Sequence, residues 1–187
     1  MKNFILIIIF SFILSSCSIK EEAEKTAITE LEGIWKTSCY VDSSDNFSHI
    51  KTITVSGTVA SYKDEGHSDT SCATDYSLEE ETLTFSIVDA VTFANGKTGH
   101  KFTVTVGSTE KITPQSASAV SALNSESKCS ASDWELNTEK ECSNDDAGDT
   151  NLCLYQLDGN NWYPECNESS YPTSVSTSDT SSTFVKQ

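Results

Sequence analysis

The sequence contains no arginine, and its 12 basic residues, all lysines, face 28 aspartates and glutamates. The formal net charge at pH 7 is −16 with histidine counted as neutral. A chain this acidic is repelled by phosphate backbones, and it lacks the guanidinium group that most often reads them. We therefore exclude nucleic acid as a partner.

The sequence also lacks a hydrophobic run long enough to cross a membrane. Its longest apolar stretch, Phe4 to Leu14, falls well short of the roughly 20 residues that a membrane-spanning helix needs. Lys2 precedes this stretch and small residues follow it, which is the layout of a secretory signal. We expect residues 1–16 to be a signal peptide; a retained transmembrane anchor is the alternative.

Catalytic motifs are missing as well. No serine lies in a Gly-x-Ser-x-Gly sequence. His49, His67 and His100 lie in polar, turn-like surroundings, where we expect solvated surface residues and no general base. The run Glu79-Glu80-Glu81 is most simply a solvated strand end or turn. We expect a protein that is not an enzyme and binds no cofactor; a cleft joining a histidine, a carboxylate and a serine would argue for an enzyme.

Patterns typical of metal sites are weak. No two cysteines have the Cys-x-x-Cys spacing of zinc sites. The segment Asn144-Asp145-Asp146-Ala147-Gly148-Asp149 gathers oxygen ligands around a glycine, but it does not fit the EF-hand template. A solvated acidic loop is the favoured interpretation and a calcium loop the alternative. We expect no metal.

What the sequence does contain is a specific pattern at the end of the apolar stretch. Leu14-Ser15-Ser16-Cys17 resembles the lipobox of bacterial lipoproteins, whose cysteine is acylated and becomes the first mature residue. The resemblance implies palmitate-type acylation of Cys17 and attachment to a membrane as its partner. Ser18, where such lipoproteins often carry a retention aspartate, implies the outer membrane of the cell envelope.

The cysteines other than Cys17 number an even six in a chain expected to be exported, so three disulfides are the default. Proximity and hairpin geometry favour the pairs Cys39 with Cys72, Cys129 with Cys142, and Cys153 with Cys166. The last two pairs remain open to interchange at this stage.

From Gly33 onward, apolar and polar residues alternate with the period of a half-buried strand. The clearest strand is Lys101 to Val106, in which Phe102, Val104 and Val106 share one face. Turn residues are expected at three places: Asp64-Glu65-Gly66, Asn95-Gly96 and Asp158-Gly159-Asn160. We therefore predict an all-β chain, a single antiparallel barrel stapled by disulfides.

Three less regular segments complete the chain. Thr113 is a plausible N-cap with Pro114 at the first helical position, which predicts one short helix to about Leu123 across a barrel end. Trp134 and Leu136 suggest a small satellite strand. After a serine- and threonine-rich stretch, residues 184–187 are expected to close the barrel by pairing with the first strand; a free tail is the alternative.

Three short motifs resemble a lipocalin-like family, in particular its small exported bacterial members. Gly33-x-Trp35 matches the first strand of that family, and Asp69-Thr70-Ser71-Cys72 matches a segment whose cysteine pairs back to it. The segment from Tyr155 to Asn160 is similar to a late hairpin, and Tyr171-Pro172-Thr173 precedes a last strand. The resemblance implies a lipocalin-like barrel.

These observations divide the chain into a signal peptide (1–16), a lipidated Cys17 with a tether (17–30) and one barrel domain (31–187). The predicted core or ligand-lining residues are Trp35, Val55, Phe85, Phe102, Val104 and Tyr155. An eight-stranded barrel is wide enough either for packed side chains or for one small ligand. We expect a non-catalytic envelope lipoprotein that binds an apolar small molecule or lipid; the alternative is a surface adhesin or structural interaction module with a packed barrel.

Overall fold

The computed structural model describes residues 29–187. Cys17, the signal peptide and most of the predicted tether lie outside the described residues. The strands are β1 (Gly33–Thr37), β2 (Tyr40–Val41), β3 (Ser48–Ser56), β4 (Val59–His67), β5 (Asp75–Thr92), β6 (Thr98–Pro114), β7 (Lys140–Ser143), β8 (Thr150–Asp158), β9 (Asn161–Asn167) and β10 (Phe184–Lys186). The helical elements are the 3₁₀ turns η1 (Thr29–Leu31) and η2 (Lys128–Ser130) and the helix α1 (Ala117–Glu126).

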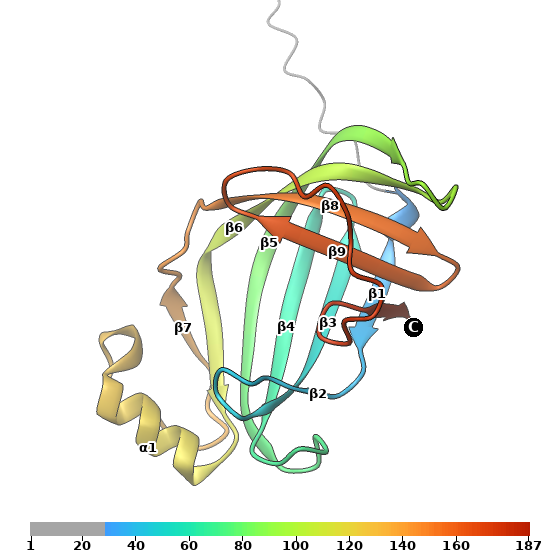
Figure 1. The fold of residues 1–187 in the computed structure, drawn as a ribbon. Helices are drawn as coiled ribbons and strands as arrows, with labels where there is room; N and C mark the ends of the chain where they lie inside the picture. Colours follow the sequence, from blue (N-terminus) through green and yellow to red (C-terminus); the bar gives the residue numbers. More distant parts are fainter. Residues whose placement is uncertain (1–28) are drawn as a thin grey trace, which may run out of the picture.

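Eight antiparallel strands form a closed barrel (Figure 1). Neighbouring strands follow the order β1, β10, β9, β8, β6, β5, β4 and β3, and β3 pairs with β1 to complete the ring. The short strands β2 and β7 pair with β3 and β6 outside this ring. The predicted all-β barrel with one short helix is therefore confirmed, and its strand number is compatible with a lipocalin-like fold.

The barrel is closed along only part of its length. On the edge away from β5, strand β6 pairs with β8 from Gly99 to Thr105 and then with the short β7 from Thr109 to Ile112. Figure 1 shows β8 and β9 crossing the upper part of the barrel while β4, β5 and β6 continue below them. The lower part of the sheet therefore has a concave face that extends the barrel interior.

Closure depends on the last three-residue strand. Strand β10 pairs with β1 on one side and with β9 on the other, so that Phe184 lies opposite both Thr37 and Trp162. Phe184 is buried, with its ring centroid 5.3 Å from that of Trp162. The predicted closing strand is confirmed, and it removes two sheet edges that would otherwise be unpaired.

The cysteines form three disulfides: Cys39–Cys72, Cys129–Cys142 and Cys153–Cys166. The last of them joins directly opposed residues of β8 and β9, as the hairpin at Asp158-Gly159-Asn160 leads one to expect. The first fastens the chain after β1 to the loop that follows β4. These are the pairs that proximity favoured, so the open interchange is resolved.

One predicted turn is wrong. Asp64, Glu65 and Gly66 lie within β4, and the chain turns afterwards, in residues 68–74. The Asp64 carboxylate is paired with His49, and Gly66 makes room for neighbouring side chains, since an added Cβ would lie 3.3 Å from Ser77 Oγ. Asp64 and Gly66 are residue types common in turns, but here they form an ion pair and a close packing contact within a strand.

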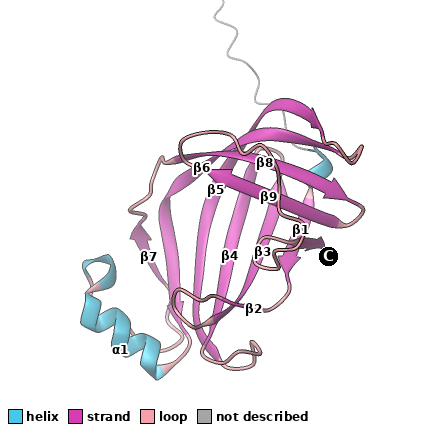
Figure 2. Ribbon diagram, in the orientation of Figure 1, coloured by secondary structure: helices cyan, strands magenta, loops and turns pink. Residues whose placement is uncertain are grey.

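The helix exists, but it begins later than predicted. Pro114 is the last residue of β6, and Ser116 is the N-cap, its hydroxyl accepting a hydrogen bond from the Ala119 amide at 3.1 Å. The helix packs near the ends of β5 and β6 and beside η2 (Figure 2). Within residues 29–187, no helix is both long and apolar enough to span a membrane.

The predicted satellite strand at Trp134 and Leu136 is also wrong. Both residues lie in the connection between η2 and β7, Trp134 without regular structure and Leu136 in a turn. Trp134 is nevertheless 3% exposed and packs on Ile112 and Cys142. A second small core thus forms beside the main one around Trp134, whereas Leu136 is exposed.

Candidate ligand-binding site

One end of the barrel interior is filled by aromatic side chains. Trp35 and Trp162, each 1% exposed, meet edge to face with ring centroids 5.7 Å apart. Phe85 and Phe102 make a similar contact at 5.6 Å, and Phe102 contacts Tyr155 at 5.3 Å. These rings arise from inward positions on five different strands, and their mutual edge-to-face packing closes the barrel floor.

The turn η1 covers this floor from outside. Leu31 is fully buried, and its carbonyl accepts a 2.6 Å hydrogen bond from Trp35 Nε1. Glu30 accepts a hydrogen bond from the Tyr155 hydroxyl, and His100 Nε2 lies 3.3 Å from the same carboxylate. The turn η1 therefore plugs the closed end of the barrel.

Beyond the aromatic floor lies an apolar cavity of about 210 Å³. Its apolar lining comes from β3, β5, β6 and β9 and includes Ile53, Leu83, Phe85, Phe102, Val104 and Trp162. Of the predicted residues, Phe85, Phe102 and Val104 line this cavity, whereas Trp35, Val55 and Tyr155 are buried but are not among its lining residues. Tyr62, Glu81 and Asn151 provide its polar lining.

An acidic hollow of about 180 Å³ adjoins the apolar cavity and shares Tyr62 and Glu81 with it. Its acidic lining consists of Glu79, Glu80, Glu81 and Glu110 with Asp146 from the segment after β7, and the neutral Asn144 from that segment also lines it. Glu79 and Glu81 continue the two-residue inward period that places Leu83 and Phe85 in the core. One face of β5 thus changes from apolar to acidic along its length, with a register shift between Glu81 and Leu83.

The expectation that Glu79 to Glu81 form a strand end or turn is therefore wrong. All three lie inside β5, opposite Asp64, Lys63 and Tyr62 of β4. The alternating period of Leu83 and Phe85 already carried the signal, because extending it by four residues places Glu79 and Glu81 on the inner face. The expectation of solvent exposure holds for Glu79, whereas Glu80 and Glu81 are half-buried.

The carboxylates of the concave face differ in their partners. Asp64 is 3.0 Å from His49 Nδ1 and accepts a 3.3 Å hydrogen bond from the Tyr62 hydroxyl. Glu110 forms a 2.8 Å ion pair with Lys128, which arrives from η2. Glu81 accepts a 2.9 Å hydrogen bond from the amide of Asn144. Among the described residues, Glu79 has no hydrogen-bond or ion-pair partner, and Glu81 has no cationic one.

This crowding changes the proton affinity of the hollow. Desolvation raises the pKa of Glu79, and the nearby charges of Asp64 and Glu110 raise it further, against the charges of Lys128 and His49, which lower it. Desolvation likewise raises the pKa of Glu81, against the hydrogen bond from Asn144, which lowers it. The pKa of Tyr62 is also raised, first by burial and then by Asp64. The hollow therefore holds negative charge that the protein itself compensates only in part.

The three histidines each lie beside carboxylates. His49 bridges Asp64 and Asp45, with Nε2 at 3.2 Å from the latter. His67 is 6% exposed with Nδ1 at 3.3 Å from Asp75, so the expectation of a solvated side chain is wrong for this residue. In the described part of the chain, no hydrogen bond joins a serine hydroxyl to any of these rings. That the protein is not an enzyme stays a prediction.

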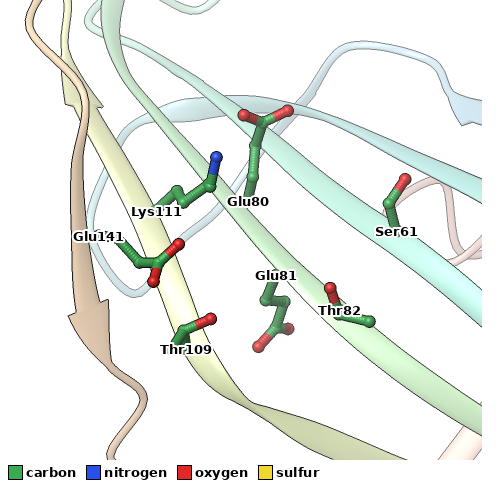
Figure 3. Close-up of a pocket in the computed structure, with 7 residues that line it drawn as sticks. All are labelled: Ser61, Glu80, Glu81, Thr82, Thr109, Lys111 and Glu141. Atoms are coloured by element: carbon green, nitrogen blue, oxygen red, sulfur yellow. The ribbon is translucent and has the colours of Figure 1, made fainter.

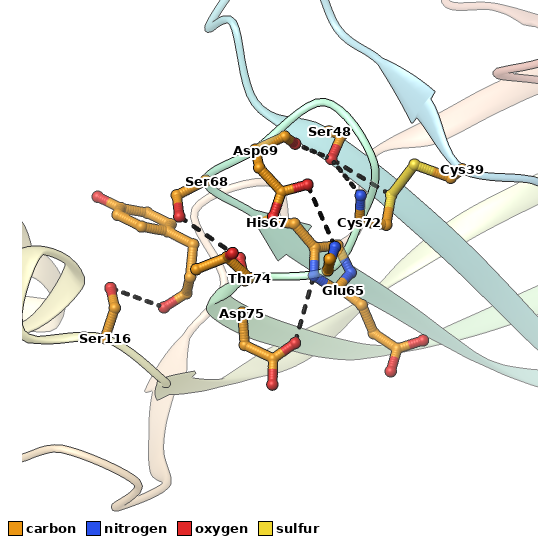
Figure 4. A network of polar contacts seen from close by, with 12 residues as sticks. Cys39, Ser48, Glu65, His67, Ser68, Asp69, Cys72, Thr74, Asp75 and Ser116 are labelled. Atoms are coloured by element: carbon orange, nitrogen blue, oxygen red, sulfur yellow. Dashed lines mark hydrogen bonds and ion pairs between the residues drawn. A yellow bond between two sulfur atoms is a disulfide. The ribbon is translucent and has the colours of Figure 1, made fainter.

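His67 is buried because residues 68–74 fold back over the end of β4 (Figure 4). The Asp69 carboxylate accepts hydrogen bonds from the Ser71 amide and hydroxyl, both at 2.7 Å, and from the Ala73 amide at 3.2 Å. Hydrogen bonds from the Thr74 and Ser71 side chains hold the pKa of Asp69 well below its usual range. The Asp69-to-Cys72 motif therefore organises a loop that the Cys39–Cys72 disulfide fastens.

The acidic segment weighed as a calcium loop is solvent-exposed from Asp145 to Asp149, as favoured, whereas its first residue, Asn144, is buried. Asn144 is 9% exposed, and its side-chain amide nitrogen donates a hydrogen bond to Glu81. Its side-chain oxygen accepts a hydrogen bond from the Asp146 backbone amide at 3.0 Å. The segment thus joins β7 to the acidic hollow. One other group, Glu110 with Cys129 and Cys142, has metal-like spacing, but both sulfurs are in a disulfide and are not free to ligate.

A larger hollow of about 320 Å³ also borders Glu81, at residues of β4 to β7 (Figure 3). Here Lys111 lies between Glu80 and Glu141 in Figure 3 and forms a 2.9 Å ion pair with Glu139. The bond to Glu139, followed by the charges of Glu141 and Glu80, raises the pKa of Lys111. At this hollow a lysine therefore lies among the carboxylates of Glu80, Glu139 and Glu141.

No protein-family model and no curated protein matches this chain. The apolar cavity and the acidic hollow must therefore be interpreted from their own chemistry.

Proposed function

We propose that this protein is a non-catalytic binding protein that holds a small apolar molecule in the apolar cavity. The observation that carries the proposal is the unfilled space of about 210 Å³ between the aromatic floor and the acidic hollow. Ligand sites are typically concave, largely apolar and supplied with a few polar groups, here Tyr62 and Glu81. A purely structural barrel would fill this space with side chains, as it fills the floor.

The volume sets the size of the ligand. Typical sites for drug-sized molecules measure about 300–1,000 Å³, so this cavity suits a smaller body. A single aromatic ring with a short chain matches it better than a long acyl chain does. Of the two expected ligand classes, apolar small molecules and lipids, we therefore propose an apolar small molecule.

Tryptophan fluorescence provides the test, because Trp162 lines the cavity and Trp35 contacts it. Trp134 belongs to the separate small core and would contribute background, so Trp134→Phe is the variant of choice. Titration with 3-phenyl-1-propanol should give a saturable change in tryptophan fluorescence. This alcohol does not absorb at the red edge of tryptophan excitation, so it does not interfere with the signal. For about ten non-hydrogen atoms we expect a dissociation constant below about 1 mM. A linear, non-saturating response would contradict the proposal.

The proposal includes attachment to the cell envelope through a lipid on Cys17, most simply in the outer membrane. Its support is the Leu14-Ser15-Ser16-Cys17 sequence together with the even number of cysteines that remain. Expression in a bacterial host supplied with alkyne-tagged palmitate should label the wild-type chain and leave Cys17→Ser unlabelled. Equal labelling of the two proteins, or absence of label from both, would contradict this part.

A further inference from the structure

We infer that the bound molecule carries a cationic head group, of the ammonium type, which lies in the acidic hollow while its apolar body fills the apolar cavity. This inference rests on the proposed binding function and adds the chemical class of the ligand. Its basis is the adjacency of two spaces with opposite character, joined at Tyr62 and Glu81.

The first step is geometric. Glu81 lies between the apolar lining that begins at Leu83 and the acidic hollow that includes Glu79, all on one face of β5. A molecule whose apolar end contacts Phe85 and Trp162 would thus place its other end near two carboxylates. The residues of one strand define both ends of the ligand.

The second step is the balance of charge. The charges of Lys128 and His49 lower the pKa of Glu79, but the ion pairs that these two side chains form are with other carboxylates. Lys128 pairs with Glu110, and the Lys51 ammonium lies 5.3 Å from the centroid of the Tyr40 ring. His49 is held between Asp45 and Asp64. Within the described residues, Glu79 and Glu81 therefore face the hollow without an ion pair of their own.

The third step is energetic. Desolvation and neighbouring charges raise the pKa of both glutamates, which means that their ionised forms are destabilised there. A ligand ammonium would relieve that destabilisation, and charge-assisted hydrogen bonds are among the stronger polar contacts. A carboxylate-bearing ligand would add to the repulsion. The same site thus attracts one sign of charge and rejects the other.

Three probes with one body and different head groups test the inference: 3-phenylpropylamine, 3-phenyl-1-propanol and 3-phenylpropionate, at pH 7.5. We expect the amine to bind at least about tenfold more tightly than the alcohol, as one charge-assisted hydrogen bond allows. We expect the carboxylate to bind more weakly than the alcohol. Equal affinity for amine and alcohol, or tighter binding of the carboxylate, would overturn the inference and leave the proposed function intact.

The double variant Glu79→Gln with Glu81→Gln locates the head group. Both changes conserve shape, and the new amide oxygen at position 81 can still accept from Asn144. The preference for the amine should fall to less than about threefold, and saturable binding of the alcohol would show that the cavity still forms. Glu141→Gln, which borders only the other hollow, is the matched control and should retain the full preference. A preference that survives the double variant would overturn the inference; failure of all three probes to bind the wild type would overturn the proposed function.

Discussion

Trp35 makes several contacts that join the barrel floor into one unit. Its ring meets Trp162 edge to face, its indole nitrogen donates to the Leu31 carbonyl, and Lys186 Nζ lies 5.1 Å from its ring centroid. Gly33, two residues earlier, has φ of +115°, which an L side chain would strain. The Gly-x-Trp motif therefore fixes both the entry of β1 and the closure of the floor.

Replacing Trp35 with Ala should lower the free energy of unfolding by about 3–5 kcal/mol, because it opens a large void in a packed core. Urea unfolding followed by circular dichroism would measure this change. Replacing the exposed Ile34 with Ala is the neighbouring control and should have a much smaller effect. A loss below about 1 kcal/mol at Trp35 would mean that the floor is held elsewhere.

Glu81 provides a test of charge burial that needs no ligand. Desolvation raises its pKa above the ordinary 4.5 in the folded protein, so the folded state retains the proton to higher pH than the unfolded state does. Stability due to this residue therefore falls as pH rises through the interval above 4.5. Glu81→Gln should be more stable than the wild type at pH 7.5, and this advantage should shrink near pH 4, as measured by thermal denaturation.

Glu141→Gln serves as the control for this pH experiment. It removes the same single negative charge as Glu81→Gln, but Glu141 does not line the acidic hollow. If Glu81→Gln and Glu141→Gln show the same pH dependence, the effect belongs to overall charge and the desolvation of Glu81 is refuted.

At the residue scale, the two-residue period was a good guide wherever the side chains were apolar. Val55, Phe85 and Phe102 are buried as that period predicts. It was not applied to Glu79 and Glu81, although they extend the same face. His67 is a different case, because a loop folds back over it and no local pattern carries that information.

At the element scale, the disulfides differ in the length of chain that they close. Cys39 and Cys72 are 33 residues apart, whereas Cys129 and Cys142 are 13 apart. In the chain-entropy account, the longer loop gives about 3.7 kcal/mol and the shorter about 2.9 kcal/mol. The disulfide that closes the longer loop is therefore expected to stabilise the fold more.

Replacing each pair with alanines should accordingly destabilise Cys39/Cys72 more than Cys129/Cys142, with losses of about 4 and about 3 kcal/mol. Urea unfolding of the two double variants would measure the difference. The reverse order would show that packing around Cys129, next to Trp134, outweighs loop entropy.

Hairpins were the most predictable elements. Asn95-Gly96 and Asp158-Gly159 join β5 to β6 and β8 to β9, because their glycines have the positive φ that such turns need. The segment around Trp134 was unpredictable as an element, since its indole is buried by a disulfide and by α1 without any strand partner. The start of α1 was misplaced because β6 runs on to Pro114, where pairing with Ser77 of β5 decides the end of the strand.

At the scale of the whole molecule, unequal strand lengths create the site. The long β5 and β6 extend beyond the short β8 and β9, so the barrel has an aromatic closed end and an acidic concave end. The sequence predicts the barrel and its closure by β10. It leaves the cavity undetermined, because the space depends on where β8 and β9 cross the longer strands.

The most direct test of the account is calorimetric titration of 3-phenyl-1-propanol into variants that fill the apolar cavity. Val106 is partly buried and lines this cavity, so Val106→Trp should place a ring inside it. Val88, 46% exposed on the same hairpin, gives the matched control Val88→Trp. We predict saturable binding with a dissociation constant below about 1 mM for the wild type and Val88→Trp, and at least about tenfold weaker binding for Val106→Trp. Unchanged binding by Val106→Trp, with the variant folded as judged by circular dichroism, would contradict the claim that the barrel interior holds the ligand.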